Sequence, residues 1–226
     1  MKLGVLFSGG KDSTLALQKA MQKEEIACLI TVASKNPESY MFHTPNIDVT
    51  RMQAESIGLP LVRVETSGQK ELELVDLSKA IIEAKKEHRI EGVVTGAIES
   101  VYQAERIQRI CDKLDLWCHN PLWKLDQENL LRQILENQYR VIISGVFAHP
   151  LDDSWLGREI RADTITELVK LREKFQISPS GEGGEIETTV LDAPFFKKRI
   201  EITKAEKKYA LNSGTYDIIE ARTVEK

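Results

Sequence analysis

Cysteine is scarce in this sequence. Its 226 residues include only Cys28, Cys111 and Cys118, and no two of them are spaced as CxxC. An odd number of separated cysteines is typical of a reducing compartment and argues against a disulfide framework or a zinc knuckle. We therefore expect a cytoplasmic protein.

Long hydrophobic runs and an excess of one charge are also missing. No apolar run approaches the roughly 20 residues of a membrane-spanning helix, and the apolar stretch at Met1–Ser8 is too short for a signal peptide. Lys and Arg number 31 against 35 Asp and Glu, so the net charge of −4 provides no global field that attracts nucleic acid. We expect a soluble intracellular protein that binds neither membranes nor nucleic acid directly.

The first half of the chain alternates strand and helix patterns. Hydrophobic residues make up 42% and charged residues 29%, a balance typical of a globular chain with a real core. The predicted strands are Lys2–Ser8, Ile26–Ala33, Leu61–Val64, Gly92–Ile98 and Trp117–Leu122. The predicted helices start at Asp12 and cover Asn46–Ile57, Leu72–Arg89 and Val101–Leu114.

This alternation predicts a five-stranded parallel sheet with right-handed crossovers and the strand order 3-2-1-4-5. Such sheets bind ligands at the switch point, which here lies between the carboxyl ends of the first and fourth strands. Residues 8–13 and 96–102 should therefore lie side by side.

The second half of the chain does not show the regular alternation of strand and helix patterns. Helical patterns at Glu128–Asn137 and Ile165–Phe175 are mixed with strand-like segments, which are Val141–Phe147, Glu187–Leu191, Lys197–Ile202 and Asp217–Ala221. We predict a smaller α+β domain and divide the chain into domains 1–124 and 125–226.

The most informative stretch is Ser8-Gly9-Gly10-Lys11-Asp12-Ser13, which follows a buried strand and opens a helix. Free backbone N–H groups and the helix dipole favour an anion there, and glycine lets the backbone approach a phosphate closely. Lys11 adds a positive charge, the two serines add hydroxyl donors, and Asp12 could hold a magnesium ion or a water. The loop matches neither the Walker pattern nor the dinucleotide fingerprint, since its glycine spacing differs from both.

The loop resembles the SGGxDS motif of the PP-loop ATP pyrophosphatase superfamily. That resemblance implies a HUP-like fold, also called adenine nucleotide alpha-hydrolase-like. It also implies cleavage of ATP between the α- and β-phosphates, with activation of a substrate as its adenylate.

Other stretches resemble the diphthine–ammonia ligase family, also called archaeal N-type ATP pyrophosphatases. They are 38–46 (ESYMFHTPN), 96–103 (GAIESVYQ), 121–123 (PLW), 153–158 (DSWLGR) and 181–188 (GEGGEIET), spread over both halves. The resemblance implies amidation of diphthine on translation elongation factor 2 with ATP and ammonia, through an acyl adenylate. A homodimer is compatible with the sequence, which does not count subunits.

The resemblance also implies site residues. ATP would contact Ser8, Gly9, Gly10, Lys11, Asp12, Ser13 and Gly96, with magnesium on Asp12. Substrate would contact His43, Asn46, Glu99, Tyr102, Trp155, Gly183 and Gly184. Aromatic faces suit the trimethylammonium group of diphthine, and the matched stretches also supply Tyr40, Phe42 and Trp123. Trp155 is expected to be the least core-like, because its stretch is irregular and polar.

Lys11, Asp12, Glu182 and Glu185 are the predicted catalytic residues. Lys11 is expected to be exposed and to stabilise charge on phosphate together with the loop amides. The two glutamates could orient ammonia, accept its proton or bind magnesium, and these roles stay open.

Two further functions use the same loop. A tRNA-modifying enzyme would be expected to carry a catalytic cysteine pair, CxxC metal sites or a basic extension, whereas Cys111 and Cys118 lie seven residues apart and the chain is acidic. A non-catalytic ATP sensor would have little use for the acidic loop 181–185. In a host without diphthine, a different carboxylate would be activated as its adenylate.

Overall fold

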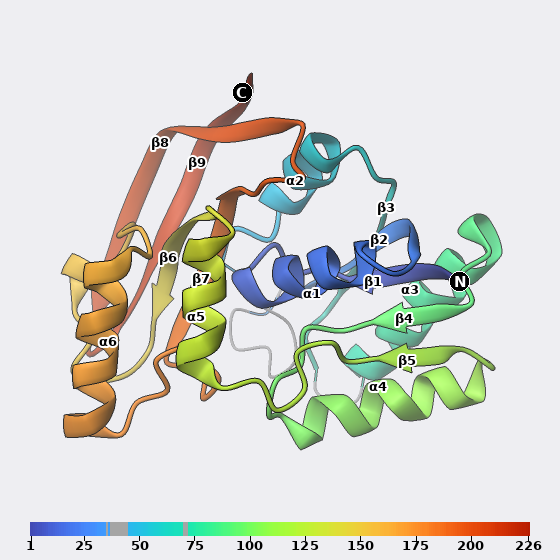
Figure 1. Ribbon diagram of the computed structural model, residues 1–226, viewed down its shortest axis with the longest axis horizontal. Coiled ribbons are helices and arrows are strands. Elements are labelled where there is room, and N and C mark those ends of the chain that lie inside the picture. Colours follow the sequence, from blue (N-terminus) through green and yellow to red (C-terminus); the bar gives the residue numbers. More distant parts are fainter. Residues whose placement is uncertain (35, 37–44, 70–71) are drawn as a thin grey trace. The chain divides into compact units, whose positions relative to one another are not determined.

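The computed structural model describes residues 1–34, 36, 45–69 and 72–226. The chain divides into two compact units, Met1–Trp123 and Lys124–Lys226. Each unit contains one sheet (Figure 1).

The first unit is built on a parallel sheet in the order β3-β2-β1-β4-β5, which confirms the predicted fold class. Its strands are β1 (Lys2–Leu6), β2 (Glu25–Ser34), β3 (Leu61–Thr66), β4 (Gly92–Val94) and β5 (Trp117–His119). Its helices are α1 (Lys11–Met21), α2 (Val49–Ile57), α3 (Leu72–His88) and α4 (Val101–Lys113).

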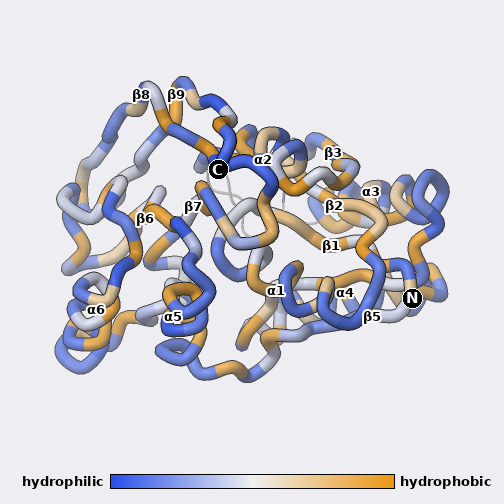
Figure 2. The backbone as a smooth tube through the Cα atoms, turned by 45° about the horizontal axis from the view of Figure 1, so that its top comes forward, coloured by the Kyte–Doolittle hydropathy of each residue, from blue (hydrophilic) through white to orange (hydrophobic). Residues whose placement is uncertain are grey.

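The central strands are apolar because helices cover both faces of the sheet. Leu3 and Val5 of β1 are completely buried, and Figure 2 shows β1 and β2 in mostly hydrophobic colours. Leu77 of α3 and Ile107 of α4 share one core cluster with β2, β3 and β4. Figure 1 shows α1 in front of the sheet and α3 behind it. Because helices cover both faces of the sheet, the loops that follow the carboxyl ends of the strands are the candidate positions for a ligand.

Three strands are shorter than predicted, and β1 loses only its last two residues, since it ends at Leu6 and not at Ser8. β4 ends at Val94, because the Oγ1 of Thr95 accepts a hydrogen bond from the backbone N–H of Ala97 (3.0 Å) and turns the chain. β5 ends at His119, and Pro121, which follows shortly after, has no N–H to donate to a ladder. Apolar content alone therefore overestimated the lengths of β4 and β5.

The second unit combines helices with an antiparallel sheet in the order β7-β6-β9-β8. Its helices are α5 (Gln127–Glu136), the 3-10 turn η1 (Asp153–Trp155) and α6 (Ala162–Phe175). Its strands are β6 (Arg140–Val146), β7 (Ile186–Asp192), β8 (Lys198–Ala210) and β9 (Ser213–Glu225).

The last two strands are much longer than the predicted segments 197–202 and 217–221. They pair from Lys198↔Glu225 to Ala210↔Ser213 and turn at Leu211 and Asn212, both of which have positive φ (51° and 64°). Two consecutive positive φ values are typical of the two-residue turn that matches the twist of a hairpin. Backbone pairing thus extends the strands through polar residues that show no hydrophobic alternation.

Every helix in the described ranges is too short or too polar to cross a lipid bilayer.

Candidate functional site

The loop between β1 and α1 presents an uncapped helix N-terminus. Gly10 is the N-cap of α1, and it has no side chain that could cap the first turn. The first helical bond runs from the N–H of Thr14 to the carbonyl of Gly10 (3.1 Å). The N–H groups that precede Thr14 in the helix have no partner within it, and the dipole makes this end positive. The loop is therefore suited to an anion such as a phosphate.

Hydroxyl groups hold this loop in shape. The Oγ atoms of Ser8 and Ser13 lie 3.2 Å apart, and Ser13 Oγ donates to the carbonyl of Gly10 (3.1 Å). Thr14 Oγ1 donates to the same carbonyl at 2.8 Å. The sequence indicated the two serines as donors to a ligand, whereas both also bond within the loop. The loop conformation is consequently supported from inside.

Lys11 is buried, which corrects the expectation that it is exposed. It keeps 3% of its surface accessible, because α1 begins at this residue and directs it inward. Its Nζ lies 2.9 Å from Oδ2 of Asp12. The other carboxylate oxygen, Asp12 Oδ1, is buried without a hydrogen-bond partner among the described residues. The pair places a positive charge and a carboxylate with one unbonded oxygen at the N-terminal end of the helix.

Gly96 lies directly against the first turn of α1. A Cβ on Gly96 would lie 2.9 Å from the backbone N of Ser13 and 3.0 Å from the carbonyl carbon of Asp12, closer than real Cβ atoms come to backbone. The segment after β4 therefore meets the loop after β1, as the strand order predicted. Glycine is required at position 96 by this approach of two backbones.

The acidic loop of the second unit, residues 181–185, leads into β7. Gly181 and Gly184 have positive φ values of 76° and 84°. Glu185 accepts a hydrogen bond from the N–H of Ser178 at Oε1 (3.0 Å), while its Oε2 is buried without a partner among the described residues. A Cβ on Gly183 would lie 2.7 Å from Oε1 of Glu185, so glycine leaves room for this carboxylate. The Glu185 carboxylate is therefore held in place through Oε1, while Oε2 has no hydrogen-bond partner among the described residues.

Two family models match this chain. The diphthamide synthase N-terminal domain matches residues 1–117, and the diphthamide synthase C-terminal domain matches residues 126–224. The chain belongs to the diphthine–ammonia ligase family.

Relatives named diphthine–ammonia ligase agree with this assignment. The diphthine–ammonia ligase of Mus musculus is 33% identical over 91% of this chain and 84% of its own length. The protein of that name from Schizosaccharomyces pombe is 36% identical over 91% of this chain, which spans only 37% of that relative. Among solved structures, a predicted tRNA methyltransferase subunit from Methanocaldococcus jannaschii aligns with a TM-score of 0.42 and 15% identity, over 86% of this chain and 98% of the other. That last likeness is too distant to support an argument.

The environment of Trp155 differs from the predicted one. Trp155 is 4% exposed, because η1 turns its indole into the interior, and the guanidinium carbon of Arg158 lies 4.6 Å from the ring centroid. The expectation that Trp155 is the least core-like aromatic residue of the matched stretches is therefore wrong. Its contact with substrate stays a prediction.

The other predicted substrate residues lie at separate positions. Tyr102 is half-buried, and the guanidinium carbon of Arg106 lies 3.3 Å from its ring centroid, so one face of the ring already holds a cation. Glu99 is exposed, and Asn46 precedes α2 with a positive φ of 59°. Trp123 is 37% exposed. Tyr40, Phe42 and His43 lie outside the described residues.

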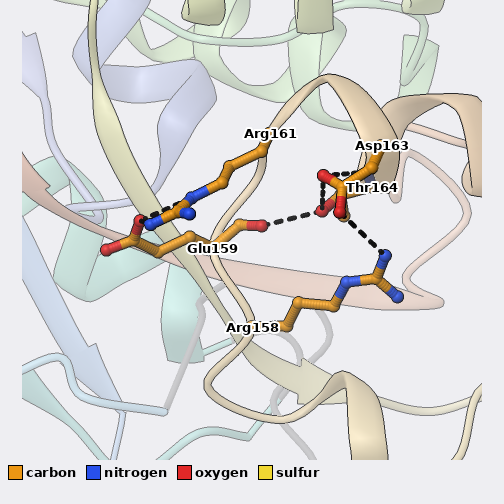
Figure 3. Close-up of a pocket in the computed structure, with 5 residues that line it drawn as sticks. All are labelled: Arg158, Glu159, Arg161, Asp163 and Thr164. Carbon is orange, nitrogen blue, oxygen red and sulfur yellow. Dashed lines mark hydrogen bonds and ion pairs between the residues drawn. The ribbon is translucent and has the colours of Figure 1, made fainter.

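A hollow of about 250 Å³ lies beside the start of α6 (Figure 3). Its two arginines are paired: Arg158 lies 2.6 Å from Glu167, and Arg161 lies 2.6 Å from Glu159. Partial burial works against the charged form of Glu159, but hydrogen bonds from Arg140 and Arg161 lower its pKa below the usual value. Each arginine that lines this hollow is therefore already paired with a carboxylate.

Gln53 and Thr14 also form hydrogen bonds with the loop, although the sequence reasoning did not select them. Thr14 follows the matched motif directly and could have been found as a second hydroxyl at the helix start. Gln53 lies on α2, and its Nε2 donates to the carbonyl of Gly9 across 44 residues of sequence. A polar residue on the buried side of a helical pattern was the one available signal.

Proposed function

We propose that this chain catalyses the ATP-dependent amidation of diphthine on translation elongation factor 2 with ammonia, giving diphthamide, AMP and pyrophosphate. The observation that carries the proposal is the match of both halves to the diphthamide synthase domains, combined with an uncapped helix N-terminus at the loop motif. Membership of the family implies ATP use, while the protein substrate and a cytoplasmic setting are our own assignments.

The reaction has to activate a carboxylate, which is a poor electrophile. One carboxylate oxygen of diphthine attacks the α-phosphorus of ATP, and the bond to the bridging oxygen breaks, so that pyrophosphate leaves. Ammonia then attacks the acyl carbon, AMP leaves, and one proton is released. We assign the backbone N–H groups of the loop and the ammonium of Lys11 to hold the phosphates and to stabilise the negative charge on the departing pyrophosphate.

A magnesium ion fits the residues at the loop. Asp12 Oδ1 is a buried carboxylate oxygen without a hydrogen-bond partner in the described part of the chain, and it would be the protein ligand. Within the described ranges no group of three or more His, Cys, Asp or Glu residues could hold a metal. This suits magnesium, which is usually bound by one or two carboxylates together with substrate phosphates and water. When bound, the ion would neutralise phosphate charge.

We assign ATP binding to domain 1–124 and binding of the acceptor to domain 125–226. Glu185 is our candidate for the group that takes the proton from ammonia, because its Oε1 is anchored by the N–H of Ser178 and its Oε2 has no partner among the described residues. Glu182 belongs to the same loop and would orient the nitrogen source.

Glu185→Gln is expected to slow amide formation by about 100-fold. The glutamine carbonyl oxygen can still accept the hydrogen bond from Ser178, so the melting temperature should change little. Release of pyrophosphate from ATP in a single turnover without ammonia should stay within a few-fold of the parent, because this step needs no base at position 185. Glu173→Gln, the same chemical change on the exposed side of α6, is the control. Equal amide formation by the parent and by Glu185→Gln would exclude the assigned role.

The reaction itself is tested with ATP, magnesium, an ammonium salt and elongation factor 2 that carries diphthine. AMP, pyrophosphate and the mass of the modified histidine peptide are measured together. We expect AMP release coupled to an acid-to-amide mass change. AMP without that mass change would replace diphthine by another acceptor. ATP that stays intact in a folded, ATP-binding sample would overturn the proposal in favour of a sensor.

A further inference from the structure

The side chain of Gln53 is completely buried on α2. The other buried residues of this helix are Val49, Thr50, Ala54, Ser56 and Ile57, so the side chain lies on the face of α2 that is shielded from water. Burying an amide costs free energy unless the amide makes hydrogen bonds. Gln53 makes such a bond to the loop between β1 and α1: Nε2 donates to the carbonyl oxygen of Gly9 at 2.9 Å.

This bond determines how one peptide unit of the loop is oriented. The carbonyl of Gly9 and the N–H of Gly10 belong to the same planar trans peptide and point in opposite directions. When Gln53 holds the carbonyl, the N–H of Gly10 points away from α2. That N–H makes a long contact with Ser8 Oγ (3.5 Å), which a phosphate oxygen could replace with a shorter bond.

The contact between Gln53 and the loop also explains why residue 9 is a glycine. Its φ is +78°, and a Cβ there would lie 2.2 Å from Oε1 and 3.0 Å from Cδ of Gln53. The space that the missing side chain leaves is therefore filled by the Gln53 amide and not by a ligand. The sequence alone suggested that both glycines make room for phosphate, and the structure assigns a different reason to the first of them.

We infer that Gln53 is a positioning residue for phosphate binding: it holds the Gly9 carbonyl so that the N–H of Gly10 is directed to the phosphates of ATP. The inference deepens the proposed function and rests on its ATP-binding step. Gln53 itself would touch neither ATP nor the reacting atoms.

The test measures the affinities of ATP and of inorganic pyrophosphate by titration calorimetry, with thermal unfolding of every variant. Gln53→Met keeps the length of the side chain and removes the donor. Thr50→Val is the matched control, because it removes a buried hydrogen bond of the same helix, from Thr50 Oγ1 to the carbonyl of Ile47 (2.5 Å), without contact to Gly9. Both variants should lose similar stability.

We expect Gln53→Met to weaken pyrophosphate and ATP binding by roughly tenfold, and Thr50→Val to bind both as the parent does. Gln53→Glu is a second variant. Its carboxylate faces the Gly9 carbonyl at neutral pH, and protonation restores a donor, so its affinity relative to Gln53→Met should rise as the pH falls.

Four results would overturn the inference. Parent-like pyrophosphate affinity in Gln53→Met, or an equal loss in Thr50→Val, would reduce Gln53 to a structural role while the proposed function stands. A parent protein that binds neither ATP nor pyrophosphate would overturn the inference and the proposed function together. If Gln53→Met does not fold, a pH-independent affinity of Gln53→Glu contradicts the inference.

Discussion

Replacement of Lys11 by methionine is expected to lower turnover by about 100- to 1,000-fold, the range measured when one preorganised donor to a developing charge is removed. Lys11 lies at the first position of α1 and is 3% exposed, so its ammonium is poorly hydrated and, in the proposed role, would act on phosphate at short range. Methionine is similar in length and fills the same space without the charge.

Burial also adds a stability effect that an exposed lysine would not have. The variant loses the contact with Asp12, which is itself 29% exposed, so we expect a loss of no more than about 1–2 kcal/mol. Steady-state AMP formation is measured at a temperature at which circular dichroism shows the variant to be folded. Lys19→Met removes the same charge from the last turn of α1 and should keep parent turnover. Turnover of Lys11→Met within threefold of the parent would contradict the assigned role.

Gly9→Ala is expected to reduce turnover by at least about 100-fold, because small displacements of a positioning loop can cost that much. Alanine at a φ of +78° costs roughly 1–2 kcal/mol by itself. The new Cβ would also lie 2.2 Å from Oε1 of Gln53, so either the loop or the Gln53 side chain has to move.

A matched glycine separates these two effects. Gly184 has a φ of +84°, but a Cβ there would have no heavy atom within 4 Å. Gly184→Ala should therefore lose only the conformational part of the unfolding free energy, and Gly9→Ala should lose more. The variant that combines Gly9→Ala with Gln53→Ala should be more stable than the sum of its single changes, since the clash is gone. Equal losses of unfolding free energy in Gly9→Ala and Gly184→Ala would show that the predicted clash with Gln53 does not destabilise the protein.

The local signals in the sequence determined the fold class and the place of the loop. Apolar runs such as Leu3–Leu6, alternating with helical patterns, were sufficient for the parallel sheet and its order, because right-handed crossovers leave few topologies. The same order predicted that Gly96 lies near the loop after β1. The Ser8–Ser13 motif contains its own geometry, since strand, glycines and helix start are contiguous in the chain.

The ends of several strands depended on interactions beyond the hydrophobic pattern. β4 is shortened by the hydroxyl of Thr95, and β8 and β9 are lengthened by their mutual backbone pairing through Leu211 and Asn212. Neither interaction leaves a hydrophobic period in the sequence. Residue patterns report burial, whereas strand length is set by hydrogen bonding.

Burial of individual polar and aromatic residues was decided only by tertiary structure. Lys11 and Trp155 are both buried, although their flanking residues predicted exposure. Gln53 reaches the loop from another helix, 44 residues away along the chain. A sequence specifies such contacts only through the packing of the whole unit, because the direction of one side chain depends on neighbours that are remote in the chain. The loop could thus be found by reading the sequence, but the residue that orients its Gly9–Gly10 peptide could not.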